Sequence, residues 1–490
     1  MKKLFKKKDT YKENLEKLLV KSTDFQQIQY TNEKTKINFS LSFLSSLIDK
    51  KIIQESALPH LLREQFEKID DAKDIIPISD VQISEQSSDI ERKLFSGYVL
   101  LTINEEENKY CFFAAQKENG RGISIPEVEF SVIGPKESFV ETLDQNLNLI
   151  RKRIPVKELI IEEVTVGKLS QTKIAFLYVD GIANTENVNT ARQRLKDIEF
   201  DELIDSSYII QMISDNKNSP FPQLLDTERP DRVSASLAEG KVAIIVDGSP
   251  HALIGPTTLI EFFSAFEDYF VNWIISSFFR LIRLFAVAFS VLVTPVYVAT
   301  LSYHYELIPR DLLSALVATR RAVPFPPILE ALFLELTIEL LREAGARLPT
   351  KVGQTIGIVG GIVIGTASVE AGLTSNVLLI FIALAALASF TTPVYRMGNT
   401  IRLLRFPFLI FAELWGFVGI IMCFCFLMGH LLKLTSLGRP YLEPIYPLRI
   451  KDFKDAFIRL PFNKQTKRPI FLQTHETKRF NSKEKKDIDE

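Results

Sequence analysis

The sequence predicts an α/β cytoplasmic N-terminal domain of two subdomains, followed by an α-helical domain that crosses a membrane several times. Residues 1 to about 260 are charged throughout, whereas residues from about 279 to 432 contain long apolar runs. The overall composition, with 24% charged and 46% hydrophobic residues, averages these two halves and so resembles an ordinary globular protein. The 59 basic residues are matched by 60 acidic ones, so the chain lacks the cationic surplus that nucleic-acid binding requires.

The first half of the chain alternates between short β-branched or aromatic runs and amphipathic helical runs. Strands separated by helices indicate an α/β domain, with subdomains at 36–154 and 155–275. Residues 1–35 are predicted to form a basic, disordered arm, either solvated or in contact with anionic lipid headgroups, and their composition is not that of a signal peptide. The predicted strands are 97–103, 110–115, 159–166, 172–179 and 241–246, and the predicted helices are 40–69, 138–153 and 187–198.

No catalytic, cofactor-binding or metal-binding pattern stands out in this half. It has no Walker phosphate loop, no Gly-x-Gly-x-x-Gly after a strand and no Gly-x-Ser-x-Gly elbow. The five histidines are scattered, without a cysteine or carboxylate partner at metal-ligand spacing. Residues 247–250 are interpreted as a turn, and residues 228–231 as a turn with a local salt bridge. We therefore predict a protein that is not an enzyme and holds no cofactor or metal.

The apolar half, residues 279–434, predicts four membrane spans, and a polar, basic tail follows at 435–490. The first span is long enough to cross a hydrocarbon core of roughly 30 Å. Arg280 and Arg283 stand at its upstream end, which by the positive-inside rule places the first half of the chain in the cytoplasm. The four spans lie near 279–304, 352–371, 376–395 and 406–432.

The number of crossings stays open at the sequence level. The loop that contains Arg396, Arg402 and Arg405 is expected on the cytoplasmic side, and so is the basic tail. The two flank the same predicted span, 406–432, so a span that crosses once cannot satisfy both. A re-entrant or half-crossing segment would remove the conflict, but the sequence does not locate it.

An amphipathic acidic helix is predicted at 328–345. Glu335 and Glu339 lie one turn apart on it. Glu339 can pair with Arg342 three residues on, which favours a structural role, whereas Glu335 has no cation at helical spacing. Because carboxylates in membrane segments usually face water, a partner or an ion path, Glu335 and Glu339 are also candidates for a cation path in an oligomer.

Four glycines, each four residues after the last, form a smooth stripe along the second predicted span. Such small-xxx-small faces allow two helix backbones to approach closely. The stripe could pack within the subunit, pack between subunits or line a pore, and the sequence does not choose among these. The glycines are Gly353, Gly357, Gly361 and Gly365, candidates for helix packing or gating.

Several motifs occur in one order over this architecture, and together they resemble the A subunit of the GerA family of spore germinant receptors. The resemblance spans about 130 to 447 and, more weakly, the first 130 residues. The motifs are GPKESF (134–139), NLNLIRKRI (146–154), VGKLSQT (166–172), SPFPQLLDTERPD (219–231), VAIIVDGSP (242–250), ELIP (306–309), VPFP (323–326), ELLREAGARLP (339–349), GQTIGIVGGIVIG (353–365) and GRPYLEPIYP (438–447).

This resemblance implies a protein of the spore inner membrane that responds to nutrients and triggers germination. It also implies partners, namely a transporter-like B subunit, a lipoprotein C subunit and further copies of the same chain. Nutrient recognition is usually placed in the B subunit, so the resemblance assigns no nutrient-binding residue here, whereas the A subunit is expected to form an oligomeric, ligand-gated ion channel for cations. Two alternatives remain, a secondary transporter and a non-conducting membrane scaffold.

Overall fold

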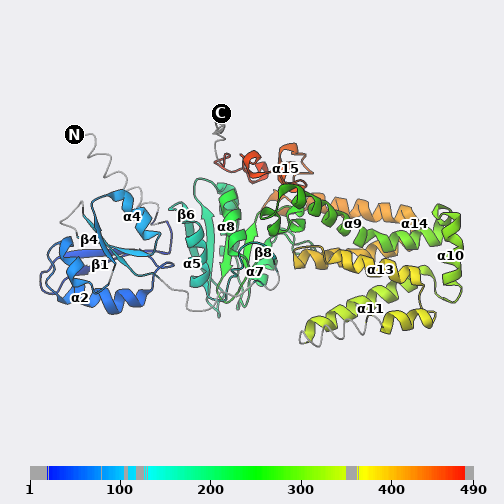
Figure 1. Cartoon of the computed structure of the whole chain (residues 1–490), viewed down its shortest axis with the longest axis horizontal. Helices are drawn as coiled ribbons and strands as arrows, with labels where there is room; N and C mark the ends of the chain where they lie inside the picture. Colours follow the sequence, from blue (N-terminus) through cyan, green and yellow to red (C-terminus); the bar gives the residue numbers. More distant parts are fainter. Residues whose placement is uncertain are drawn as a thin grey trace, which may run out of the picture.

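The computed structural model describes residues 19, 21–78, 80–103, 109–116, 126, 129, 131–348, 361 and 363–479. Two sheet-containing subdomains and a bundle of long helices follow one another along the longest axis of the molecule (Figure 1). The helices of the bundle extend away from the second subdomain, so one end of the bundle adjoins the soluble part and the other end is remote from it (Figure 1). We call these the near end and the far end.

The first subdomain is a five-stranded antiparallel sheet in the order β1-β2-β4-β5-β3. Alternate strand residues point to opposite faces. Leu41, Leu101 and Phe113 pack against the helices on one face, and Leu100 and Phe112 pack with α4 on the other. The strands are β1 (Phe25–Thr31), β2 (Asn38–Leu44), β3 (Val81–Ser84), β4 (Tyr98–Ile103) and β5 (Tyr110–Ala114), and the helices are η1 (Ile52–Ala57), α2 (Leu58–Arg63), η2 (Ile69–Asp71), α3 (Ala72–Ile75) and α4 (Ser87–Leu94).

The second subdomain is also a five-stranded antiparallel sheet, in the order β6-β7-β9-β10-β8. Helices α5 and α8 cover one face and α6 and α7 the other, so every residue of β9 is buried. Its elements are α5 (Leu143–Arg153), β6 (Leu159–Val166), β7 (Thr172–Val179), α6 (Thr185–Lys196), α7 (Ser206–Ile213), β8 (Leu225–Thr227), α8 (Pro230–Glu239), β9 (Val242–Val246) and β10 (Ala252–Gly255).

The boundary between the subdomains differs from the sequence prediction. Leu147 and Ile150 of α5 pack with Leu177 and Ile245 of the second sheet, so this subdomain begins before residue 143 rather than at 155. The expected disordered arm, 1–35, contains β1, and the expected helix 40–69 begins with residues of β2, because these two segments pair as a hairpin.

A buried ion pair joins the two subdomains. Arg151 of α5 donates from Nη2 to Asp24 Oδ1 at 2.7 Å and from Nε to Oδ2 at 2.9 Å, next to β1. Ser22 and Ser46 also donate to this carboxylate. Burial disfavours the ionised carboxyl, but Arg151 and the two hydroxyls outweigh it and hold the pKa of Asp24 below its usual value. The pair therefore fixes the first subdomain on the second.

Among the residues that the structure describes, two helices of the bundle are long and apolar enough to span a membrane, α9 (Trp273–Tyr303) and α14 (Tyr395–Lys433). An 18-residue stretch of each has a mean hydropathy of 2.1 in α9 and 2.2 in α14. Further helices of the bundle include α10 (Arg310–Arg320), α11 (Pro327–Arg347) and the shorter apolar α13 (Asn376–Ser389). Of the predicted span 352–371, residues 352–360 and 362 lie outside the described part, and residues 363–370 are helical.

Helix α14 is a hairpin of two antiparallel arms and not one straight rod. Gly416 at its centre has φ 59° and ψ −136°, which is not helical. Phe411 and Phe426 would be about 22 Å apart along a straight helix, yet their ring centroids are 6.1 Å apart. Arg396 at the start of α14 and His430 near its end contact the soluble part at Asp226 and Ser219 respectively. Both ends of α14 therefore lie at the near end of the bundle.

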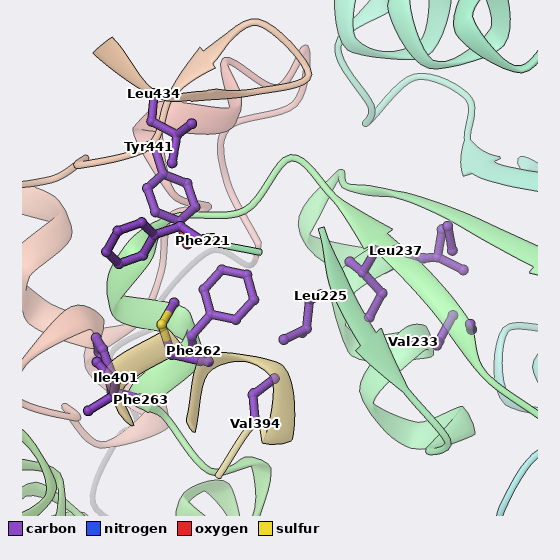
Figure 2. Close-up of a cluster of buried hydrophobic side chains, with 14 of the residues drawn as sticks. Phe221, Leu225, Val233, Leu237, Phe262, Phe263, Val394, Ile401, Leu434 and Tyr441 are labelled. Carbon is purple, nitrogen blue, oxygen red and sulfur yellow. The ribbon is translucent and has the colours of Figure 1, made fainter. Parts of the chain in front are cut away.

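The bundle and the second subdomain share one continuous hydrophobic core (Figure 2). Leu225 and Leu237 come from the second subdomain, Phe262 comes from η3 (Leu259–Phe263), Ile401 comes from α14 and Tyr441 follows α14. The Tyr441 side chain is fully buried, and its hydroxyl donates to the carbonyl of Pro222 at 2.7 Å. The soluble part is thus packed firmly onto the base of the bundle.

The C-terminal segment 435–479 is folded, and it lies against the second subdomain and the linker to α9. Arg459 is buried and donates to the carbonyls of Asp268 and Val271, both at 2.6 Å. Asn184 at the start of α6 donates to the carbonyl of Gln473 at 2.8 Å. The segment includes β11 (Thr435–Ser436), β12 (Arg439–Pro440) and α15 (Phe453–Ala456). The sequence predicted only a polar, basic tail for this region.

Candidate functional site: charged side chains inside the helical bundle

Glu335 lies at the centre of the bundle and binds partners from two other helices. Its side chain is 1% exposed, accepts a hydrogen bond from Thr294 Oγ1 of α9 at 3.0 Å and forms an ion pair with Arg405 of α14. Arg405 also donates to the carbonyls of Ser290 on α9 at 2.9 Å and Ala385 on α13 at 3.4 Å. One carboxylate–guanidinium pair therefore connects α9, α11, α13 and α14.

The partner of Glu335 comes from a distant part of the sequence. Glu335 has no cation at helical spacing on its own helix, and its partner in the structure, Arg405, is 70 positions further along the chain. Arg405 reaches Glu335 because the first arm of α14, before Gly416, packs beside α9 and α11. A pattern confined to one helix could not have found it, and Arg405 was expected in a cytoplasmic loop before the span 406–432 rather than inside the bundle.

Glu339 lies one turn further along α11, towards the near end, and is more exposed. It accepts from Arg342 Nη1 at 2.9 and 3.1 Å, as the spacing of three residues predicts, and Arg402 Nε is 3.8 Å away. The Arg342 guanidinium lies over the ring of Phe390, 4.9 Å from its centroid. Glu339 and Glu335 are thus the two acidic members of one network that also contains three arginines.

Glu330 performs a role that its position in the sequence does not reveal. It is fully buried, pairs with Arg320 of α10 at 2.9 Å and accepts from the backbone N–H of Ser375 at 3.1 Å. Ser375 is the N-cap of α13, so Glu330 stabilises the start of a different helix. Glu343, by contrast, pairs with Arg347 on the same helix, and both are exposed.

The predicted glycine stripe is described at two of its four positions. Gly353 and Gly357 lie outside the described residues. Within the described part of the chain, no atom lies within 4 Å of a Cβ built on Gly361, and the nearest to one on Gly365 is a methyl carbon of Leu379, at 3.7 Å. Close packing against a helix of the same subunit is therefore not seen at Gly361.

In the soluble half, the predicted salt-bridged turn is present, since Arg229 Nη2 donates to Asp231 Oδ2 at 2.7 Å with both side chains buried. Among the residues that the structure describes, no group of three or more His, Cys, Asp and Glu side chains could hold a metal ion. Burial raises the pKa of the Cys111 thiol to about 12, which keeps this cysteine protonated and unreactive.

These features define a class of protein in which a soluble two-subdomain unit is packed on an apolar helical bundle that buries a charged network. The chain belongs to the Bacillus/Clostridium GerA spore germination protein family, whose model matches residues 13–471. This confirms the family that the sequence motifs indicated.

Two relatives and one solved structure illustrate the similarity. The chain is 50% identical to the spore germination protein GerQA of Bacillus cereus over 472 residues, 96% of this chain and 94% of the relative. It is 35% identical to the uncharacterized membrane protein YfkQ of Bacillus subtilis over 467 residues, 94% and 90% of the two chains. The crystal structure of the N-terminal domain of the A subunit of the Bacillus megaterium spore germinant receptor GerK3 has 26% identity and a TM-score of 0.37, covering 50% of this chain and 92% of that domain.

Proposed function

We propose that the chain is the A subunit of a nutrient-responsive germinant receptor in the inner membrane of the spore, where it acts with a transporter-like B subunit and a lipoprotein C subunit. This proposal rests on the similarity to the GerA family, which extends along almost the whole chain. The two long apolar helices and the relative named a membrane protein support the membrane location. The role assigned is that of a receptor subunit and not of an enzyme.

In this proposal α9, α13 and both arms of α14 cross the membrane, with the soluble part and the C-terminal segment in the cytoplasm. At about 1.5 Å per residue, the two arms of α14 measure about 31 and 25 Å, close to the thickness of a hydrocarbon core. Arg280, Arg283 and Arg396 stand at the near end, where the positive-inside rule favours the cytoplasm.

We further propose that several copies assemble around an axis and form a ligand-gated cation path past Glu335 and Glu339. No atom of the described residues lies within 4 Å of a Cβ at Gly361, which suits packing between subunits, and the apolar side chains of Leu329, Phe333 and Leu340 on α11 are exposed in the single chain. Both carboxylates are paired with arginines in the described conformation, so a conducting state requires the arginines to release them.

The complete receptor, reconstituted in vesicles with a potassium gradient, provides the test. We expect nutrient-dependent loss of the gradient and an oligomer of this chain in mild detergent. Gly361→Leu should abolish both, whereas Gly429→Leu, which also has open space around its Cβ, should abolish neither. A monomeric chain, or an intact gradient after nutrient addition to the wild-type receptor, would refute the channel proposal.

One observation favours a second candidate, a non-conducting membrane scaffold. The Glu335–Arg405 pair is buried and links four helices, which is the arrangement expected of a structural network. In this case the same reconstitution would show an assembled receptor that dissipates no gradient through this chain.

A further inference from the structure

A cavity of about 570 Å³ lies where the soluble part, the linker to α9 and the C-terminal segment meet. Its walls come from α8, from residues 258–269 of the linker and from residues 444–479 of the C-terminal segment. Its volume falls within the range of about 300–1,000 Å³ that is typical of small-molecule sites. Since all three parts of the chain contribute, the cavity exists only when the C-terminal segment is docked.

The interior of the cavity is lined by aromatic side chains from two of these parts. Phe266 and Tyr269 come from the linker, and Phe462 and Phe471 come from the C-terminal segment. Aromatic rings on separate walls can contact both faces of an apolar group placed between them. The cavity therefore suits a molecule with an apolar body at least as large as a phenyl ring.

The charged side chains of the lining are balanced, four cationic and four anionic, and each has a partner among the described residues. A ligand with net charge would enter without a free counter-charge and would lose its hydration, which is costly in a partly enclosed site. An uncharged ligand, or a zwitterion that brings both charges, avoids this cost. The pairs are Arg232 with Glu129, Arg479 with Glu239, Lys241 with Glu261, Arg468 with Glu476, Asp455 with Arg280, and Asp452 with the backbone N–H of Ile470.

We propose that this cavity is a binding site for a small molecule that has no net charge, either uncharged or zwitterionic, and carries an apolar body. The bound molecule lies against Tyr269, whose hydroxyl donates to Asp455 at 3.0 Å. The guanidinium groups of Arg280 and Arg459 face the Tyr269 ring at 5.6 and 5.3 Å from its centroid. Arg280 belongs to the first turns of α9, so occupancy of the site acts directly on the base of the bundle.

Four probes with the same benzyl group and different charge test the ligand class: L-phenylalanine (zwitterion), N-acetyl-L-phenylalaninamide (uncharged), N-acetyl-L-phenylalanine (anion) and 2-phenylethylamine (cation). Saturation-transfer NMR measures their binding to the full chain in lipid nanodiscs, with empty nanodiscs subtracted. We expect at least tenfold lower Kd values for the first two probes than for the last two. Equal affinity of all four, or binding by none at millimolar concentration, would overturn the proposal.

Two tryptophan substitutions on α8 test whether the probes bind in this cavity. Ala235 is an exposed residue of α8 that lines the cavity, so Ala235→Trp fills the space and should remove binding of the uncharged probe. Ser234→Trp, on the same helix but outside the lining, is the matched control and should retain it. Retained binding in Ala235→Trp would place the probe elsewhere and refute the assignment.

The charge balance can be tested by removing one carboxylate. Glu261→Gln leaves the Lys241 ammonium, which is 5% exposed, without its anionic partner. The anionic probe should then gain at least tenfold in affinity relative to the cationic one. Glu239→Gln leaves Arg479 without its anionic partner, so it should also raise the affinity of the anionic probe relative to the cationic one. This variant replaces the first if Glu261→Gln does not fold. Unchanged selectivity in the folded variants would show that the paired charges do not set the ligand class.

Discussion

The Glu335–Arg405 pair shows how much a single buried charge depends on its partner. Moving a carboxylate and a guanidinium out of water costs several kcal/mol per ion, and their mutual attraction offsets that cost only when the geometry is good and the remaining donors are satisfied. Here Arg405 uses two carbonyls besides the carboxylate, and Glu335 also accepts from Thr294. Losing one partner should therefore be worse than losing both.

A structural role of Glu335 and a role in cation passage lead to different effects of Glu335→Gln on stability and on potassium release. Glu335→Gln leaves Arg405 buried and unpaired, and we expect a loss of about 3 kcal/mol of unfolding free energy. The double variant Glu335→Gln/Arg405→Gln should recover most of it. Thermal unfolding in detergent gives the stability, and potassium release from spores gives the function. Normal stability with slowed release in the single variant would contradict the structural role, and unchanged release would contradict the cation path.

Asp205 provides a pH-dependent prediction in the soluble part. Although burial disfavours its ionised form, hydrogen bonds from Ser207 and Ser249 lower its pKa to about 2, from 3.8. A carboxyl whose folded pKa is depressed contributes stability above the unfolded value and loses it as the pH falls through the folded value. The contribution should therefore disappear between about pH 4 and pH 2. Because the residue is partly exposed and is the N-cap of α7, we expect about 1 kcal/mol.

Acid titration of the full chain in detergent, followed by far-ultraviolet circular dichroism, measures this effect. Asp205→Asn can still cap α7 but cannot titrate, so its unfolding curve should be flatter than that of the wild type between pH 4 and pH 2. Asp201→Asn, at an exposed position nearby, is the control. Identical curves for the wild type and Asp205→Asn would show that the hydrogen bonds to Asp205 do not stabilise the folded state.

At the scale of elements, α14 explains the conflict that the sequence left open. Arg396 before the predicted span 406–432 and the segment after that span both lie at the near end, because the chain reverses at Gly416. The expected cytoplasmic loop is instead the start of α14, and its Arg405 lies inside the bundle with Glu335. The conformation at Gly416 is one that side chains with a Cβ rarely adopt, and a Cβ there would lie 3.0 Å from His304 Nε2 and 3.2 Å from Tyr303. Tyr303 also donates from its hydroxyl to the carbonyl of Glu413 at 2.6 Å, which fixes the reversal at the far end of α9.

The hairpin can be tested by cross-linking in a background without the native cysteines. Cysteines introduced at Phe411 and Phe426, whose rings are in contact, should form a disulfide with Gly416 in place. Gly416→Ala should reduce the yield severalfold, because alanine is strained in this conformation at a cost of about 1–3 kcal/mol. Gly429→Ala, whose added methyl group has no atom of the described residues within 4 Å, should leave the yield unchanged. A full yield in Gly416→Ala would mean that the reversal does not depend on glycine.

The sequence predicted elements with a strong apolar signal better than elements without one, and the reason is physical. Strands 159–166 and 172–179 appear with the predicted bounds because their apolar residues are buried and their pairing is local. Strand β1 was missed because it contains three glutamines and so carries little hydrophobic signal. A re-entrant or half-crossing segment was considered, but the reversal could not be located in α14, because a hairpin of two apolar arms has the same composition as one long span.

The same limit applies to the candidate site. Glu339–Arg342 and Glu343–Arg347 follow from spacing along one helix, and the structure contains both pairs. Glu330 and Glu335 bind residues from other helices, and those contacts depend on how the helices pack. The sequence could therefore identify the acidic residues, but not the partners that decide what they do.

At the scale of the whole molecule, the docking of the C-terminal segment places this segment and the soluble part at the same end of the helical bundle. Leu259 in the linker donates its N–H to the carbonyl of Tyr441 at 2.8 Å, and Arg280 of α9 contacts Asp455 of α15. Such contacts cannot form across a membrane. If the bundle is embedded, the soluble part and the C-terminal segment must therefore lie on the same side, and the number of crossings between them must be even.

The last prediction follows from this geometry and uses single cysteines in the background without native cysteines. Leu307, just after the far end of α9, is exposed, and so are Asp201 in the second subdomain and Glu476 in the C-terminal segment. A membrane-impermeant maleimide added to right-side-out vesicles should label Leu307→Cys and spare Asp201→Cys and Glu476→Cys. After the vesicles are permeabilised, all three should react. Labelling of Glu476→Cys from outside without Asp201→Cys would contradict the docking of the C-terminal segment, whereas labelling of both without Leu307→Cys would reverse the orientation set by Arg280 and Arg283.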